Sequence, residues 1–583
     1  MKPFLRAVAK ACLLLALAPC ASLSQTPAFP GAEGFGASAT GGRGGRVIVV
    51  TTTAASGPGS LQHALDQTGP RYVVFAVSGG IDAQIHLTHG DVTIAGETSP
   101  GGITIRGFVT DETPFQDQAV QDPAQFAENW ILRHVRIRPG SGGPSDDGLR
   151  LRYTRNAIID HVSVGNAVDE AVEISYSNGI TIQNSLLAET VGGHSFYGGM
   201  LMNYSNPAHG FALDRLSIHH NLFVRIEGRL PEASRESAAA AGSTMDLELS
   251  NNLYWDPRFF IALGADTNVV TNGLGQPYPI HYRLNAVGNV FRTGTSFPYG
   301  MWDDQILRAP SAGGNELFVS GNTMSRYPGR SDYQLFYCCN DYAGETSPDA
   351  TSRSATARTT RHPFPSITYT DGAALRETLL ARAGAFPRDP MDQRLVLPVA
   401  EDRIDPAAPN TNPAGDALLP AYSGAAPAAP ADTDLDGMPD AWETARGLDP
   451  RTPDHAGSDL STSGYDNLEV YLHELSAERV GSPPPGGGTV AAPRIVAYRP
   501  ARVVLRGLQS RVTLSGTAIA AAGISRIEAK VGDRPARLVS ATADWRLRVK
   551  AFVPGRTRVE IRAIDRDGRV SAPFLHTVVR RPR

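Results

Sequence analysis

The stretch Leu216-Ser217-Ile218-His219-His220-Asn221 decides the fold, because its pattern of alternating apolar and polar residues before an asparagine recurs along the chain. The recurrences are ITIQN at 180–184, LELSNN at 247–252, LNAVGN at 284–289 and LFVSGN at 317–322. Their closing asparagines, at 184, 221, 252, 289 and 322, are separated by 37, 31, 37 and 33 residues. A strand-and-turn unit repeated at such intervals is typical of a solenoid or a propeller.

The uneven spacing favours a solenoid, since a propeller needs regular blades of four strands. Asparagine tolerates the left-handed backbone of a tight turn, and its amide can bond to the same position one coil away. We therefore predict that residues 26–400 form an all-β domain, a right-handed parallel β-helix. A short helix after the N-cap residue Ser60 is expected near its N-terminal end.

The flanking regions differ from this repeat in composition. Lys2, Arg6 and Lys10 with the apolar run Ala11–Ala18 resemble an export signal, so we expect a secreted protein that keeps only the adjacent Cys338 and Cys339. Residues 491–583 alternate apolar and polar residues between turns, as β-sandwiches do. The predicted organisation is a signal peptide (1–25), the β-helix (26–400), a Pro/Ala-rich linker (401–431), a small module (432–480), a second linker (481–490) and an Ig-like or fibronectin-III-like sandwich (491–583).

Charge is distributed unevenly along the chain. The 54 Lys and Arg residues nearly balance the 58 Asp and Glu residues, which does not indicate a nucleic-acid-binding protein. Residues 491–583, however, hold 20 basic and 6 acidic residues, and the rest holds 34 and 52. The acidic body and the basic C-terminal region are therefore expected to meet different partners. No apolar run reaches the roughly 18 residues of a membrane span.

Carboxylates gather around two neighbouring predicted coils. They are Asp146 and Asp147 before one strand, and Asp169, Glu170 and Glu173 after the next. Stacking of coils would bring these charges together, and a hard cation such as Ca²⁺ would relieve their repulsion. A solvated acidic loop is the alternative on spacing alone.

The chain resembles the pectate lyases of polysaccharide lyase family 1 over about residues 28–330. The resemblance is carried by Phe29-Pro30-Gly31-Ala32-Glu33-Gly34-Phe35-Gly36, Ile158-Ile159-Asp160-His161 and His219-His220-Asn221-Leu222-Phe223 through Arg229-Leu230-Pro231. It implies Asp147, Asp169 and Glu173 as ligands of a catalytic Ca²⁺, with Asp146 substituting for a further aspartate, and Arg229 as the catalytic base.

Two departures concern substrate binding. The family's second arginine falls on Ser234, with Arg235 one residue late, and the region of its substrate-binding lysine holds Gly192, Gly193 and His194. We assign Arg235 and His194 to substrate binding on this resemblance.

The resemblance implies a secreted, monomeric pectate lyase that cleaves the acidic plant cell-wall polysaccharide α-1,4-polygalacturonate by Ca²⁺-dependent β-elimination. Two alternatives stay open: a polygalacturonase-type hydrolase, which shares the β-helix, and a non-catalytic β-helix that binds acidic glycans or mediates adhesion.

A second calcium motif lies in the small module. Asp432-Thr433-Asp434-Leu435-Asp436-Gly437-Met438-Pro439-Asp440-Ala441-Trp442-Glu443 fills positions 1, 3, 5, 6, 9 and 12 of an EF-hand-type loop. It resembles the dockerin-like and thrombospondin-type-3-like loops of secreted bacterial proteins. We expect a structural Ca²⁺ held by Asp432, Asp434, Asp436, Asp440 and Glu443.

Overall fold

The computed structural model describes two parts of the chain. From 26 to 481 it covers all residues except 111–126, 191–197, 236, 265, 272–276, 309–311, 338–353, 405–414 and 420–424. From 494 to 581 it covers all except 498–501, 506–509, 520–523, 533, 543, 552 and 566–569. The predicted signal peptide, His194 and the paired cysteines lie outside the described residues.

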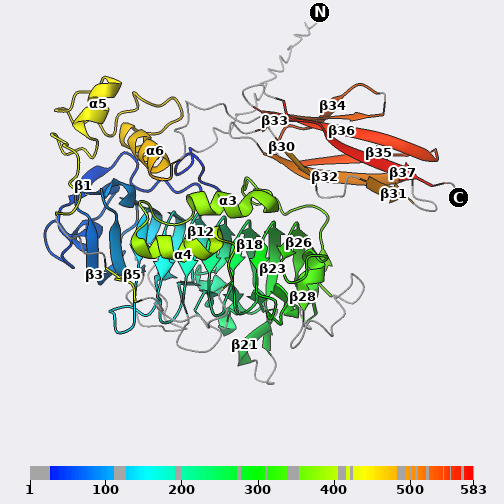
Figure 1. Cartoon of the computed structure of the whole chain (residues 1–583), viewed down its shortest axis with the longest axis horizontal. Coiled ribbons are helices and arrows are strands. Elements are labelled where there is room, and N and C mark those ends of the chain that lie inside the picture. Colours follow the sequence, from blue (N-terminus) through cyan, green and yellow to red (C-terminus); the bar gives the residue numbers. More distant parts are fainter. Residues whose placement is uncertain are drawn as a thin grey trace, which may run out of the picture.

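Two long parallel sheets form the body of the protein (Figure 1). The first sheet contains, in spatial order, β1 (Arg46–Val50), β2 (Arg71–Phe75), β4 (Val92–Ala95), β6 (Ala127–Arg133), β9 (Thr154–Asp160), β12 (Asn178–Gln183), β15 (Asp214–His219), β18 (Thr244–Ser250), β23 (His281–Val287), β26 (Glu316–Ser320) and β29 (Thr356–Ala357). Each strand pairs in parallel with the corresponding strand of the next coil, which is the topology of a parallel β-helix. The predicted fold class is confirmed.

The second sheet turns a corner at β5 (Ile103–Val109), which also pairs with β3 (Gly79–His86). Residues 103–105 of β5 pair with β7, whereas Phe108 and Val109 pair with β8. On one side lie β7 (Val135–Ile137), β10 (Ser163–Gly165), β13 (Leu186–Ala188), β16 (Leu222–Val224), β19 (Leu253–Trp255), β24 (Val290–Arg292) and β27 (Thr323–Met324). On the other lie β8 (Leu149–Arg152), β11 (Val172–Ser175), β14 (Met200–Met202), β17 (Glu232–Ala233) and β20 (Ala262–Leu263). A coil therefore has three faces.

Shorter pairs of strands complete the C-terminal coils. Ile261 bridges Trp302, so that β25 (Trp302–Asp303) and its partner β28 (Phe336–Tyr337) continue the side of β20. The antiparallel pair β21 (Asp266–Thr271) and β22 (Pro277–Pro279) leaves the body after β20.

Apolar side chains at equivalent positions of successive strands stack into rows that fill the interior. Ile180, Leu216, Leu247, Leu284 and Leu317 occupy one row across five consecutive strands, and each is fully buried. Because a coil cannot bury such a row alone, its stability depends on the coils above and below it.

An asparagine ladder follows the first strand of successive coils. Each Nδ2 of Asn221, Asn252 and Asn289 donates to the side-chain oxygen of the next asparagine, at 3.2, 3.2 and 2.9 Å, and Asn322 donates to Asp332. The predicted coil-to-coil bonding is thus confirmed for these four asparagines. Asn184 is an exception. It lies one position earlier, in the left-handed conformation, and donates to Asp160 at 3.0 Å.

Among the described residues of the β-helix region, four α-helices accompany the strands. α1 (Leu61–Leu65) begins after Ser60, whose side chain accepts from His63 N, so the predicted cap is confirmed. α2 (Gln305–Arg308) is one turn long. The all-β prediction for 26–400 missed α3 (Gly372–Arg382) and α4 (Pro390–Ala400). Their apolar side chains cover the outer face of β13, β16 and β19, which the interior does not bury.

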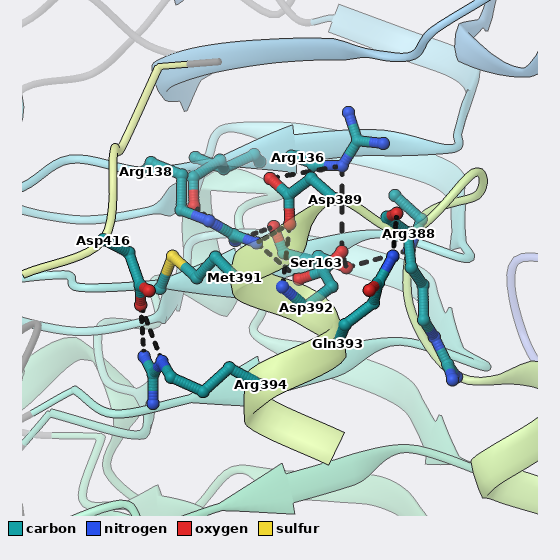
Figure 2. Close-up of polar contacts among 12 residues, drawn as sticks. Arg136, Arg138, Ser163, Arg388, Asp389, Met391, Asp392, Gln393, Arg394 and Asp416 are labelled. Carbon is teal, nitrogen blue, oxygen red and sulfur yellow. Dashed lines mark hydrogen bonds and ion pairs between the residues drawn. The ribbon is translucent and has the colours of Figure 1, made fainter. Parts of the chain in front are cut away.

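Buried ion pairs fix α4 against the coils (Figure 2). Asp392 accepts from Arg138 Nη2 at 2.5 Å and from Ser163 Oγ at 2.8 Å, and Asp389 lies 3.6 Å from Arg136 Nε. Both arginines and Asp392 are no more than 1% exposed. Each of these charges faces an opposite charge, which offsets part of the cost of removing it from water.

The small module packs on the first coils (Figure 1). It contains α5 (Asp440–Arg446) and α6 (Asn467–Arg479), and no helix precedes the acidic loop in 425–439. Leu468 and Leu472 of α6 contact the outer faces of β2 and β4 at Tyr72 and Ala95. The Tyr72 hydroxyl also donates to Asp466 at 2.6 Å. The module is therefore part of the β-helix surface.

The C-terminal region is a β-sandwich. One sheet contains β30 (Arg494–Ala497), β32 (Arg511–Ile519) and β35 (Asp544–Lys550). The other contains β31 (Arg502–Leu505), β37 (Phe574–Arg580), β36 (Gly555–Asp565), β33 (Ile524–Val531) and β34 (Arg537–Ser540). Alternate residues of the two sheets, such as Leu514, Leu547 and Ile561, form a separate core.

Within the described residues, no helix combines the length and apolar character required to cross a membrane.

We predict that Asp392→Asn lowers the free energy of unfolding by about 3–5 kcal/mol, because it leaves two buried arginines with one fewer counter-charge. Unfolding in urea followed by circular dichroism measures the effect. Asp402→Asn is the matched control, since the exposed Asp402–Arg292 pair at 2.8 Å should contribute only about 0–1 kcal/mol. Equal effects of the two substitutions would show that the buried pairs do not stabilise the docking of α4.

Candidate active site

Parallel pairing places residues from distant coils at one edge of the second sheet. Asp147 precedes β8, Glu170 precedes β11 and Arg229 precedes β17. Because these strands run in parallel and in register, the segments that precede them lie one above another. Residues 59 positions apart in the chain are thereby brought into contact.

Three carboxylates form a compact group at this edge. Oxygen atoms of Asp147, Asp169 and Glu170 all lie within 4.8 Å of one another. Asp147 and Glu170 are 6% and 3% exposed, and the Glu170 backbone N–H donates to Asp147 Oδ1 at 3.1 Å. We refer to these three residues as the acidic triad.

Arg229 lies directly against the acidic triad. Its Nη1 contacts Glu170 Oε1, and its Nε lies 3.2 Å from Glu232 Oε2. The intervening strand β14 is preceded by Gly198 and Gly199. A Cβ at Gly199 would lie 2.1 Å from the Arg229 carbonyl oxygen, so the glycine allows the two segments to approach closely.

Electrostatics at the acidic triad oppose full ionisation. Burial and the neighbouring charges of Glu173 and Asp169 raise the pKa of Asp147. Burial also raises the pKa of Glu170, and Asp147 and Asp169 add to this effect while Arg229 opposes it. Burial alone would lower the pKa of Arg229, but the carboxylates of Glu170 and Glu232 outweigh it and raise that pKa. The group therefore has more negative charge than one arginine can balance, which favours a further cation.

Two of the predicted metal ligands lie outside the acidic triad. Glu173 is held by Arg152, whose Nε and Nη2 donate to its two oxygens at 2.9 and 2.6 Å. Its charge still reaches Asp147. Asp146 is exposed, and it is its backbone carbonyl that bonds to Asp169 N, at 3.2 Å.

The position of Arg235 does not suit the substrate-binding role predicted for it. Its side chain is fully buried, its Nη2 donates to the His281 carbonyl at 2.7 Å, and its guanidinium stacks on Tyr282 with 4.7 Å to the ring centre. A side chain enclosed in this way cannot reach a polymer at the surface. Arg235 lies just past β17 in the left-handed backbone conformation, so its side chain does not continue the alternation of that strand.

Two contacts that define the site are not indicated by the sequence motifs. They are the pairing of Glu170 with Arg229 and the pairing of Arg152 with Glu173. Arg150 and Arg152 alternate along β8, and Arg150 Nη1 lies 3.9 Å from Asp147 Oδ2. That alternation was a usable signal, because residues two apart on a strand share a face.

The module contains a second acidic group. Oxygens of Asp432, Asp434 and Asp436 lie within 4.8 Å of one another, as do those of Asp436, Glu443 and Asp454. Burial and the four aspartates raise the pKa of the fully buried Glu443 to about 8. Both Glu443 oxygens, Asp434 Oδ2 and Asp454 Oδ1 are buried and have no hydrogen-bond partner among the described residues.

The members of this group differ from the expected ligands at two positions, Asp440 and Asp454. Asp440 accepts from the backbone and hydroxyl of Thr433 at 2.7 and 2.8 Å and does not belong to the group. Asp454 joins it from the segment after α5. The twelve-residue loop motif could not predict Asp454, which lies eleven residues beyond the last loop position.

Comparison with known proteins finds relatives that match most of the chain. No protein-family model matches it. It is 31% identical over 481 residues to the probable pectate lyase C of Emericella nidulans, covering 80% of this chain and 98% of that protein. The corresponding protein of Aspergillus flavus is 32% identical over 476 residues, covering 79% and 97%. A pectate lyase structure from Paenibacillus sp. 0602 matches with a TM-score of 0.38 and 15% identity, covering 62% of this chain and 96% of that one.

These relatives define a polysaccharide lyase built on a parallel β-helix. The extent of the match, nearly the whole length of each fungal relative at more than 30% identity, establishes the narrower assignment. The chain belongs to the pectate lyase family.

Proposed function

We propose that the protein is a secreted, monomeric, calcium-dependent pectate lyase that cleaves α-1,4-polygalacturonate by β-elimination, with Arg229 as the base. The supporting observation is the contact of Arg229 with the acidic triad, of which Asp147 and Glu170 are buried. We propose secretion because the sequence predicts a signal peptide. A monomer is the default state.

The acidic triad fits a hard cation. Three carboxylates from two coils converge, and the raised pKa values of Asp147 and Glu170 show that their charge is incompletely balanced. Bound there, Ca²⁺ would supply positive charge that neutralises the substrate carboxylate and the negative charge developing beside it. We assign Asp147, Asp169 and Glu170 to this role, with Glu173 and Asp146 as the remaining candidates.

Arg229 would remove the C5 proton of the uronate. The proton would pass to the guanidine, and the electrons of the C5–H bond would form the C4–C5 double bond. The bond from C4 to the bridging oxygen would break with its electron pair on the oxygen, which would take a proton from water. Glu170 and Glu232 favour the protonated form of Arg229 in the free enzyme, so both contacts must weaken before the arginine can act. Neutralising Glu170 at the metal site would remove the stronger of them.

Activity should therefore require alkaline pH. An arginine of ordinary pKa costs roughly 5 kcal/mol to deprotonate near pH 8.5, and the deprotonated fraction rises about tenfold for each pH unit below the pKa. Arg229→Ala should reduce the initial rate by roughly 10²–10⁴-fold. The measurement is the ultraviolet absorbance of the unsaturated product from polygalacturonate as a function of pH.

Arg155→Ala is the control, because Arg155 is a partly exposed arginine of β9 that pairs with the exposed Glu128 at 2.8 Å. A rate optimum near about pH 5 would contradict the assignment of the base. New reducing ends without absorbance would indicate a hydrolase, and the absence of both would indicate a protein that binds acidic glycan without cutting it.

The choice of metal ligands can be tested separately. Glu170→Gln should raise the Ca²⁺ concentration for half-maximal activity by roughly tenfold or more, because it removes one of three converging charges. Glu173→Gln should change that concentration less, since Glu173 is occupied by Arg152. Titration of activity with Ca²⁺ after chelation measures both. A larger effect at Glu173 would restore the ligand set implied by the family resemblance.

The second acidic group supports a structural Ca²⁺ in the module. Its buried oxygens without partners are the atoms that a cation would satisfy, and its members are Asp432, Asp434, Asp436, Glu443 and Asp454. Asp440 would serve to shape the loop through Thr433.

Calcium should therefore stabilise the module against heat. At a concentration one hundred times the dissociation constant, binding at this site adds about 2.7 kcal/mol, and Glu443→Gln should reduce the shift in melting temperature to the part that the acidic triad contributes. Differential scanning calorimetry with Ca²⁺ and with a chelator makes the measurement. Glu478→Gln is the matched control, being an exposed glutamate of α6. A shift as large in Glu443→Gln as in Glu478→Gln would show that the stabilising ion does not bind in the module.

A further inference from the structure

Four basic side chains of the C-terminal sandwich meet at one of its edges. β35 and β34 are the edge strands of their respective sheets and lie in contact. A groove of about 860 Å³ is formed there. It is lined by four cationic side chains: Arg534, Arg537, Arg548 and Lys550.

Buried and exposed side chains alternate along β35, and the exposed ones are basic. Trp545, Leu547 and Val549 are buried in the sandwich core, and Arg546, Arg548 and Lys550 point outward between them and are exposed. Cations two residues apart on a strand are separated by roughly 6.5–7 Å. They form a row of positive charge that can follow an extended polymer.

The groove cations have no acidic partner in the part of the sandwich that the structure describes. Elsewhere in the sandwich, Arg526 pairs with Glu528 at 2.8 Å and Arg562 with Glu560 at 2.7 Å. None of the four groove cations has an ion pair with a carboxylate that the structure describes, and no described residue lining the groove is acidic. Exposed cations left in this way are available to an external anion.

We propose that this groove binds an acidic polysaccharide chain and holds the enzyme on its polymeric substrate. The assignment to a polyuronate rests on the proposed function, whereas the affinity for a polyanion rests on the groove alone. No aromatic side chain lines the described groove, so it lacks the stacking platform on which single-stranded nucleic acids are bound. A polymer of carboxylates needs only the row of cations.

The test compares two double variants of the full-length protein. Arg548→Gln/Lys550→Gln removes two groove charges, and Arg526→Gln/Arg562→Gln removes two charges that are already paired. Binding to polygalacturonate is measured by sedimentation with a chelator present, so that no cleavage occurs. At about 50 mM salt the groove variant should bind about tenfold more weakly, with a shallower dependence on salt, and the control should change by less than about twofold.

The outcomes separate the two proposals. Equal binding by the two variants would overturn the groove assignment. Groove-dependent binding that is tighter to double-stranded DNA or to vesicles of anionic phospholipid than to polygalacturonate would also overturn it. Release of unsaturated product from a short oligomer should be unchanged in both variants, because the acidic triad and Arg229 lie on the β-helix. If the protein binds through the groove but forms no unsaturated product, the proposed lyase activity is rejected and the proposed binding site in the groove is supported.

Discussion

Parallel stacking of coils is the constraint on which the rest of the structure depends. No coil buries its apolar row alone, and the asparagine ladder leaves each buried amide dependent on the next coil. The same register that stacks leucines in the interior stacks Asp147, Glu170 and Arg229 at the edge of the second sheet. A site assembled in this way is rigid, because moving one of its residues would require displacing a coil that is bonded on both sides.

In the proposed active site, the negative charge of the carboxylates exceeds the positive charge of the arginine beside them. A structural ion pair normally balances charge, as Asp392 does with the buried arginines beneath α4. The acidic triad does not reach balance with Arg229, and the loop group around Glu443 has no basic partner among its members. Carboxylates kept in this state are costly to the fold, and the cation proposed for each site would offset that cost.

The sequence was sufficient to predict those features that depend on a repeated local pattern. The asparagine spacing predicted the coils, and Ser60 predicted the start of α1. The helix α3 also had a local signal, because Asp371 caps it and Leu375 and Leu379 are four residues apart. Arg235 and Asp454 were different. Their surroundings depend on which residues of other coils or loops lie opposite, and one sequence does not record that register.

Docking of the module on the first coils has a consequence for the order in which the chain can fold. The bond between Tyr72 and Asp466 joins residues 394 positions apart, and the apolar outer faces of β2 and β4 stay uncovered until α6 is available. Contacts of such separation form late and slow folding. The N-terminal coils, although made first during synthesis, are completed among the last. The outer surface of the N-terminal coils can therefore be completed only after the chain has been made as far as α6.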